Sequence, residues 1–348
     1  MNTPPLPVAL IGCGQIGRAH AGHALRGQDV RVAAVCDPGP AAAALGAQLG
    51  VPHFADARAL LDAVPVRAAI VAVPNQAHAD AALACIEHRV PVLVEKPITD
   101  SVAEGERLCA AAESAGVPLL VGHQRRHSPT LRRAKQLIVG GVLGRPVSVH
   151  AMAVWLKPDA YFDVAWRREP GGGPVLINLI HDVDMLRWLV GEIVEVQAIA
   201  SNAQRGFAVE DTAAIALRFA NGALGTMGVT DAAVAPWNWD LAAGEAAHYP
   251  PQDIDSHYFS GTEASLTLPR LNIYRYRERR GWHEELTQER TIVHRADPYL
   301  EQLRHLRAVA EGTEAPLCPG RDGLRTLQAT LAVLEAARTQ APVRLAAG

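Results

Sequence analysis

The chain has 348 residues, of which 49% are hydrophobic and 20% are charged, and its formal net charge is −3. This length predicts two domains, and this composition is typical of a soluble globular protein. The nearly balanced charge without a basic run argues against a nucleic-acid partner. No apolar run is long enough to cross a bilayer, which excludes a membrane-spanning class.

Five cysteines are dispersed along the chain without a CxxC pair: Cys13, Cys36, Cys85, Cys109 and Cys318. An odd, scattered set is typical of reduced thiols rather than of a disulfide framework. The first residues, MNTPPLPVALIGCG, lack the basic segment, apolar stretch and cleavage site of a secretory signal. We therefore expect a cytoplasmic protein.

The first third of the sequence alternates short apolar runs with alanine-rich amphipathic stretches. The apolar runs predict strands at residues 7–13, 30–37, 68–74, 91–97 and 117–123, and the stretches between them predict helices at 41–50, 77–89 and 101–116. Ser101 and Glu104 form a capping-box pattern at the start of the last helix. Continuous apolar strands that alternate with helices predict a parallel sheet.

The pattern changes after about residue 124. A predicted helix at 128–141 leads into an apolar segment at 144–155, and later segments alternate apolar and polar residues at 194–201, 212–219, 223–230, 263–268, 272–278 and 291–295. Asn221-Gly222 is a hairpin signal. Two further helices are predicted at 298–312 and 323–339. The second region is therefore predicted to form a largely antiparallel sheet with one open face.

Three glycines lie where the first predicted strand turns into a helix. Gly12 permits a tight turn, Gly14 lets the backbone approach a pyrophosphate, and Gly17 lets helix and strand pack closely. The helix N-terminus attracts an anion. Asp37, twenty residues after Gly17, ends the next strand, where a carboxylate would hold the ribose hydroxyls. This combination predicts a dinucleotide site; the alternative is a glycine turn without a ligand.

The residues around Asp37 bear on the choice of dinucleotide. Pro38 follows it, no lysine or arginine is adjacent, and Arg31 lies at the other end of the same strand. A 2′-phosphate would find no cation there. We therefore predict a preference for NAD over NADP.

The segment VEKP places Glu95, Lys96 and Pro97 at the carboxyl end of a predicted parallel strand. Ligands of open α/β sheets bind at that edge. A lysine there can donate a hydrogen bond to a substrate oxygen and stabilise developing negative charge. The alternative is a solvated lysine before a turn.

The second candidate segment, GGGPVLINLIHDVDMLRWLVG, predicts a helix that starts at residues 171–174 and ends at Gly191. Asn178 and His181 are three residues apart and project from one face. An imidazole with an ordinary pKa of about 6.5 suits proton exchange with an alcohol. The alternative is a buried structural histidine. We expect Asp182 to be solvated and Asp184 to orient the ring or bond to backbone.

Other chemistries have little support. His181, Asp182 and Asp184 lack the spacing of a zinc-binding helix, so we predict no metal, and there is no GxSxG elbow of a serine hydrolase. Four residues in predicted loops could either contact a sugar or pack in the core: Trp166, Arg167, Trp237 and Trp239.

These features in this order resemble the Gfo/Idh/MocA oxidoreductases, a family that includes inositol dehydrogenases and glucose–fructose oxidoreductase. The matching motifs are GCGQIG, Asp37, VPNQAH, VEKP, VGHQRRHSP, residues 171–184, EDTAAIALRF and the final helix pair. The resemblance implies an α/β Rossmann domain at residues 1–124 and an α+β domain at 125–348 with a large, open, mainly antiparallel sheet. In this family that sheet commonly forms the interface of a homodimer or homotetramer, and the terminal helices can pack back on the first domain.

The resemblance also implies roles for individual residues. Lys96 matches the catalytic lysine and His181 the active-site histidine. The implied cofactor-binding residues are Gly12, Gly14, Gln15, Ile16, Gly17, Asp37, Val73, Pro74, Asn75, His78, Glu95 and Lys96. The candidate substrate-binding residues are Asn178, Gln124, Arg125, Trp166 and Arg167.

One departure from the family pattern changes the predicted chemistry. The family's aspartate, four residues before the histidine, is replaced here by Ile177, and Asn178 follows it. An amide can hydrogen-bond a hydroxyl but cannot accept its proton, so His181 is the candidate base on this helix.

We expect an NAD-dependent oxidoreductase that oxidises a secondary hydroxyl of a sugar, cyclitol or sugar acid. One alternative is an enzyme that processes glycosides and recycles its NAD. The other is a non-catalytic protein that senses NAD or a sugar.

Overall fold

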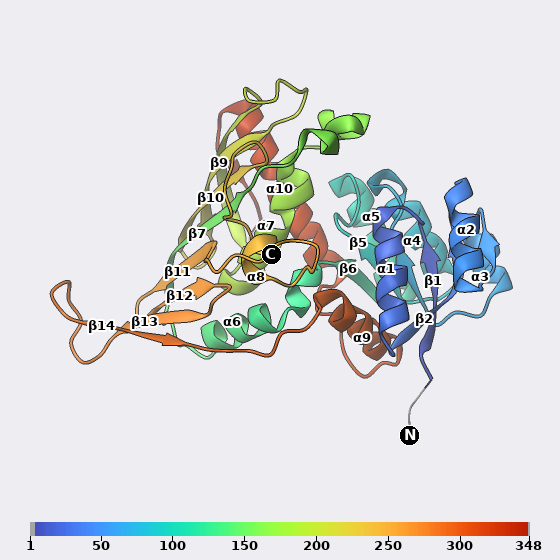
Figure 1. Ribbon diagram of the computed structural model, residues 1–348, viewed down its shortest axis with the longest axis horizontal. Coiled ribbons are helices and arrows are strands. Elements are labelled where there is room, and N and C mark those ends of the chain that lie inside the picture. The colour runs from blue at the N-terminus through green and yellow to red at the C-terminus, as the bar shows by residue number, and fades with distance from the viewer. Residues whose placement is uncertain (1–3, 347–348) are drawn as a thin grey trace. The chain divides into compact units, whose positions relative to one another are not determined.

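The computed structural model describes residues 4–346 and divides the chain into two compact units (Figure 1). The first unit runs to His127 and also includes Asp297–Leu327. The second unit consists of Ser128–Ala296 and the residues from Gln328 onward.

The first unit is built on a six-stranded parallel sheet with the order β3-β2-β1-β4-β5-β6. Its strands are β1 (Leu6–Ile11), β2 (Val30–Cys36), β3 (His53–Phe54), β4 (Ala68–Val71), β5 (Val92–Glu95) and β6 (Leu119–Gly122). The strands β4, β5 and β6 are buried at every position, as their apolar sequences predict, with Glu95 at the end of β5 as the one charged residue. The strand order reverses beside β1, the place where open α/β sheets bind ligands.

Helices connect and cover these strands. They are α1 (Gln15–Arg26), α2 (Pro40–Leu49), α3 (Ala57–Ala63), α4 (His78–Glu87), α5 (Val102–Ala115) and α9 (Pro298–Ala310), with short 3₁₀ turns η1 (Asn75–Ala77) and η2 (Gln124–His127). Leu303, Leu306 and Val309 of α9 join the apolar core of β1, β2 and β4. A segment that follows the sheet of the second unit in sequence thus completes the core of the first unit.

The capping box at the start of α5 is only half formed. Ser101 Oγ accepts a hydrogen bond from the Glu104 backbone N–H at 3.3 Å. The Glu104 carboxylate pairs with Arg107, one turn further along the helix. A nearby guanidinium is a stronger partner for this carboxylate than a backbone amide.

The second unit contains a nine-stranded sheet with the order β14-β13-β12-β11-β7-β10-β9-β8-β15. Its strands are β7 (Pro146–Val154), β8 (Ile193–Ser201), β9 (Thr212–Phe219), β10 (Leu224–Thr230), β11 (His257–Gly261), β12 (Ser265–Leu268), β13 (Asn272–Tyr276), β14 (Leu286–Arg290) and β15 (Val343–Arg344). Among the described strands of this sheet, only the β7–β10 pair is parallel. The predicted mainly antiparallel sheet is confirmed.

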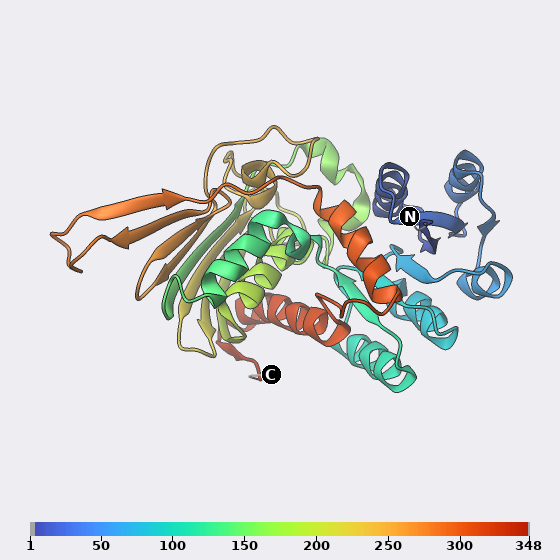
Figure 2. The ribbon, with the colours of Figure 1, turned by 90° about the horizontal axis from the view of Figure 1, so that it is seen from below.

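The helices of the second unit lie on one side of this sheet (Figure 2). They are α6 (Pro129–Val139), α7 (Ile180–Val190) and the later part of α10 (Gly320–Thr339), while α8 (Trp239–Ala243), η3 (Asp159–Asp163), η4 (Ala165–Arg168) and the π-helical η5 (Val175–Leu179) lie in connections. Along β9, buried and exposed residues alternate, which is the pattern of a strand with one covered face and one open face.

The hairpin prediction is confirmed, and one strand prediction is wrong. Asn221 and Gly222 connect β9 to β10, and Gly222 adopts φ +87°. Residues 291–295 do not form a strand; β14 instead lies directly before them. Its pairing with β13 ends where Asn272 meets Arg290, so the alternating residues beyond it have no partner strand.

No helix within residues 4–346 has the length and apolar character needed to span a membrane. All five cysteines are buried free thiols.

Candidate active site

The glycine turn joins β1 to α1 and leaves no room for side chains at two positions. Gly12 adopts φ +98°, and a Cβ there would lie 2.4 Å from the Ala72 carbonyl carbon. A Cβ on Gly17 would lie 1.9 Å from the Gly12 carbonyl oxygen. Only glycine permits this approach of the turn to β4 and of α1 to the turn.

Gly14 has the opposite surroundings. A Cβ built there meets no described atom within 4 Å, and the neighbouring Gln15 and Ile16 are exposed. Gly14 is the N-cap of α1, and no side chain of the described residues caps the first turn, which also contains no acidic residue. Uncapped amides and the positive end of the helix dipole favour an anion. A pyrophosphate therefore fits this turn.

Asp37 connects the end of β2 to the glycine turn. Its Oδ2 accepts a hydrogen bond from Cys13 N at 2.8 Å, and its Oδ1 accepts one from Gly39 N at 2.7 Å. A carboxylate has about four lone-pair directions, so each oxygen retains capacity for a ribose hydroxyl. The half-buried carboxylate is thus held in place by backbone groups without being saturated.

His78 links the loops that follow β4 and β5. Its Nδ1 lies 2.8 Å from the Pro97 carbonyl oxygen, and its Nε2 lies 2.9 Å from that of Val73. The ring is buried, and burial lowers its pKa despite these two carbonyls. Asn75 and Val73 are half-buried and Pro74 is exposed, so the outer part of this loop is accessible.

Glu95 is buried at the end of β5, and its partner was missed by the sequence analysis. Its Oε1 lies 2.7 Å from Nε2 of the fully buried His20 on α1, and its Oε2 accepts a hydrogen bond from Lys96 N at 3.2 Å. Burial by itself would raise the pKa of Glu95, but the His20 hydrogen bond and the charges of His20 and Lys96 lower it below its ordinary value. The Lys96 side chain remains partly exposed at this edge of the sheet.

The segment after β6 contains the candidates Gln124 and Arg125. Gln124 is half-buried, and Arg125 is buried. The adjacent Arg126 is committed to structure, because its guanidinium contacts the Asp322 carboxylate and the Leu317 carbonyl. Arg126 is therefore unavailable for binding an acidic substrate.

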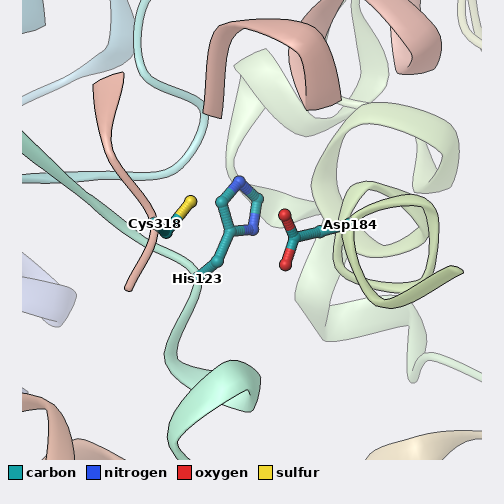
Figure 3. Close-up of side chains that lie close together, drawn as sticks. All are labelled: His123, Asp184 and Cys318. Carbon is teal, nitrogen blue, oxygen red and sulfur yellow. The ribbon is translucent and has the colours of Figure 1, made fainter. Parts of the chain in front are cut away.

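His123 and Cys318 lie next to one another in the first unit (Figure 3). A ring nitrogen of His123 and the Cys318 sulfur are within 4.8 Å, where residues 317–319 approach β6.

In the second unit, the candidate segment begins with a π-helical turn, Val175–Leu179, before α7. The prediction of one continuous α-helix is wrong here. Ile177, Asn178 and His181 are partly exposed, whereas the residues between and around them from 175 to 187 are buried. The shared exposure agrees with one accessible face, and π-turns frequently occur at functional sites.

The expectation that Asp182 is solvated is wrong. Asp182 is buried, and its Oδ1 lies 3.0 Å from His257 Nε2 on β11. Asp184 is also buried. Asp182 and Asp184 are buried for the same reason, because α7 packs into the core of the second unit on nearly every side. Their carboxylates therefore need partners inside the protein.

Lys157, in the loop after β7, was not predicted as a site residue. Its Nζ lies 2.7 Å from Asn178 Oδ1, 3.3 Å from Asp231 Oδ2 and 4.6 Å from the centre of the Tyr161 ring. Burial lowers the pKa of Lys157, although Asp231 opposes this shift. The only sequence signal was an isolated lysine at the end of an apolar strand.

The tryptophans of the predicted loops have different surroundings. Trp166 and Trp237 are about half exposed. Trp239 is buried, and its Nε1 donates a hydrogen bond to Glu245 at 3.0 Å, so it belongs to the core. Arg167 stacks on Tyr161, with its guanidinium carbon 4.0 Å from the ring centre.

The chain is similar to named dehydrogenases. It is 30% identical to inositol 2-dehydrogenase 2 of Saccharopolyspora erythraea over 62% of this chain and 64% of that protein. It is 28% identical to myo-inositol 2-dehydrogenase of Thermotoga maritima over 63% of this chain and 67% of that protein. The alignments thus span about two thirds of each relative.

The fold is similar to that of the WlbA dehydrogenase from Bordetella pertussis, which was solved in complex with NADH and UDP-GlcNAcA. The TM-score is 0.79 at 26% identity, over 98% of this chain and 99% of that chain. Residues 6–123 match the model of the oxidoreductase family with an NAD-binding Rossmann fold, and residues 131–247 match the model of the GFO/IDH/MocA C-terminal domain. The chain therefore belongs to the Gfo/Idh/MocA oxidoreductase family.

Proposed function

We propose that this protein is an NAD-dependent dehydrogenase that oxidises a secondary hydroxyl of a sugar, cyclitol or sugar acid. The observation that carries the proposal is the edge of the parallel sheet, where the open, uncapped glycine turn, Asp37 and the partly exposed Lys96 follow the carboxyl ends of β1, β2 and β5. The similarity to inositol 2-dehydrogenases supports a polyol or sugar as substrate.

The proposed mechanism assigns one task to each candidate residue. When bound, NAD⁺ supplies the hydride acceptor. His181 accepts the proton of the substrate hydroxyl, and the Lys96 ammonium stabilises the oxygen as negative charge develops. Five further residues orient the substrate: Asn178, Gln124, Arg125, Trp166 and Arg167. Binding of the cofactor is assigned to the glycine turn, Asp37, the loop Val73–His78 and Glu95.

We further propose that NAD is preferred over NADP. Asp37 presents a negative charge where an NADP phosphate would lie, and exposed Pro38 follows it. Replacing Asp37 with alanine is expected to weaken NAD⁺ binding about 10- to 100-fold, the loss of a charge-assisted hydrogen bond, and to change NADP⁺ binding less. Calorimetric titration with both dinucleotides measures the two affinities. A melting curve of the variant shows whether the loss of the Asp37 hydrogen bonds has destabilised the protein. Tighter binding of NADP⁺ than of NAD⁺ by the unaltered protein contradicts the preference.

The activity is tested by incubating the purified protein and NAD⁺ with a panel of cyclitols, sugars and sugar acids while recording NADH absorbance. Net NADH formation with at least one compound supports a dehydrogenase. A protein that retains its cofactor and forms no net NADH with any of them matches the NAD-recycling alternative. Binding without any chemistry matches a sensor.

The proposed setting is a homodimer or homotetramer in the cytoplasm. The sheet face opposite the helices exposes apolar side chains, among them Ile199 (68% exposed), Leu224 (50% exposed) and Tyr258 (37% exposed). A second copy that covers this face would bury them. Five free thiols support a reducing compartment.

A further inference from the structure

We infer that the preferred substrate is a sugar acid and that the Arg167 guanidinium and the Asn178 side-chain amide bind its carboxylate. The inference rests on the proposed function, in which both residues orient the substrate. Both side chains belong to the second unit.

Lys157 fixes the orientation of the Asn178 amide. A lysine ammonium can only donate hydrogen bonds, so the Asn178 atom 2.7 Å from its Nζ must be the carbonyl oxygen. The Asn178 Nδ2 is therefore turned away from Lys157, and it has no hydrogen-bond partner among the described residues. Asn178 is half-buried, so it offers two N–H donors to a ligand.

The lysine itself is locked in place. Lys157 is only 7% exposed and contacts both Asp231 and the Tyr161 ring. Asp231 is also held by Arg205, whose Nε lies 3.1 Å from its Oδ1. Asp231 is buried and is engaged by two cations, so its carboxylate is not accessible to a neutral substrate.

Arg167 adds a cation that forms no ion pair with any carboxylate of the described residues. It lies over the same Tyr161 ring as Lys157, and its Nη1 donates a hydrogen bond to the Tyr161 carbonyl at 2.7 Å. Its Nε is buried and has no hydrogen-bond partner among residues 4–346. A buried donor on a charged group is costly to leave unsatisfied, and a guanidinium binds planar oxyanions with two parallel hydrogen bonds.

These groups offer donors and positive charge to the ligand. A carboxylate consists of acceptors only and carries the opposite charge, so it satisfies Asn178 Nδ2 and Arg167 together. A neutral hydroxyl group carries no negative charge that could balance the Arg167 guanidinium. The arrangement therefore selects uronic or aldonic acids over the corresponding neutral sugars.

Calorimetric titration of the full chain with matched compounds tests this inference. The acids are D-glucuronate, D-galacturonate and D-gluconate, and the neutral compounds are D-glucose, D-galactose and myo-inositol. We expect at least one acid to bind about 10-fold or more tightly than its neutral counterpart, which is the size of one charge-assisted hydrogen bond. Equal binding of acids and neutral sugars, or no binding of any acid, overturns the inference.

Three variants separate charge recognition from structural support. Arg167→Gln is expected to weaken binding of the preferred acid about 10- to 100-fold and to weaken binding of the neutral compound less than about 3-fold. Asn178→Asp keeps the shape of the side chain and adds a negative charge, which repels the carboxylate of the ligand. This variant should therefore also weaken binding of the acid more than binding of the neutral compound. Arg168→Gln, at the exposed neighbouring position, is the control and should change neither the affinity for the acid nor that for the neutral compound. Equal weakening of acid and neutral compound by Arg167→Gln overturns the inference.

The same experiment distinguishes the two proposals. An acid that binds through Arg167 but gives no NADH supports the carboxylate site and contradicts the dehydrogenase. NADH formation from neutral sugars, without selective binding of any acid, supports the dehydrogenase and contradicts the carboxylate site.

Discussion

Replacing His181 with alanine is expected to lower kcat about 100- to 10,000-fold, the usual contribution of a general base. Ile177 and Asn178 cannot accept a proton, so neither neighbour on the accessible face of this segment can replace the imidazole. NAD⁺ binding should be unchanged, because the residues assigned to the cofactor all lie in the first unit. Initial rates of NADH formation and calorimetric titration with NAD⁺ measure the two effects.

Two controls make the His181 result specific. Added imidazole should restore part of the activity of the alanine variant, since it can replace the missing base but not a lost packing contact. His150→Ala removes an exposed histidine from the open sheet face and should leave kcat unchanged. A His181→Ala enzyme with a rate within about 3-fold of the unaltered one contradicts the proposed base.

Replacing Lys96 with methionine is expected to lower kcat about 100- to 1,000-fold, the effect of removing one preorganised donor to a developing oxyanion. Methionine retains an unbranched apolar side chain and removes the ammonium. The effect should appear in kcat more than in KM, because the charge on the substrate oxygen develops in the transition state.

The Lys96→Arg variant is compared with the methionine variant, because arginine keeps the positive charge and changes the geometry of the hydrogen-bond donors. It should retain more activity than methionine. If the methionine variant turns over as fast as the unaltered enzyme, or if only its KM changes, Lys96 does not stabilise the reacting oxygen.

The first unit was predictable because its signals are local. Parallel strands such as β4 and β6 are buried on both faces, and they therefore appear in the sequence as unbroken apolar runs. The glycine turn is equally explicit, since the contacts at Gly12 and Gly17 permit no other residue. The prediction of a dinucleotide site used this local information together with Asp37 at the end of the next strand.

The missed features depend on partners that are distant in sequence. Lys157 becomes a site residue only when the fold brings it to Asn178, and His20 becomes the partner of Glu95 only when the fold brings α1 within reach of the end of β5. Asp182 is buried because β11 supplies His257. Periodicity contains no information about these pairings, nor about the π-turn, which departs from the 3.6-residue period on which the helix prediction rests.

The most direct test follows the hydrogen that leaves the substrate. The compound that is turned over fastest is prepared with deuterium on the carbon that bears the oxidised hydroxyl, and the NADH formed is analysed by mass spectrometry and NMR. Net hydride transfer to the dinucleotide held at the glycine turn predicts one deuterium at the nicotinamide C4. If every compound that binds leaves the nicotinamide unlabelled, this protein is not a dehydrogenase.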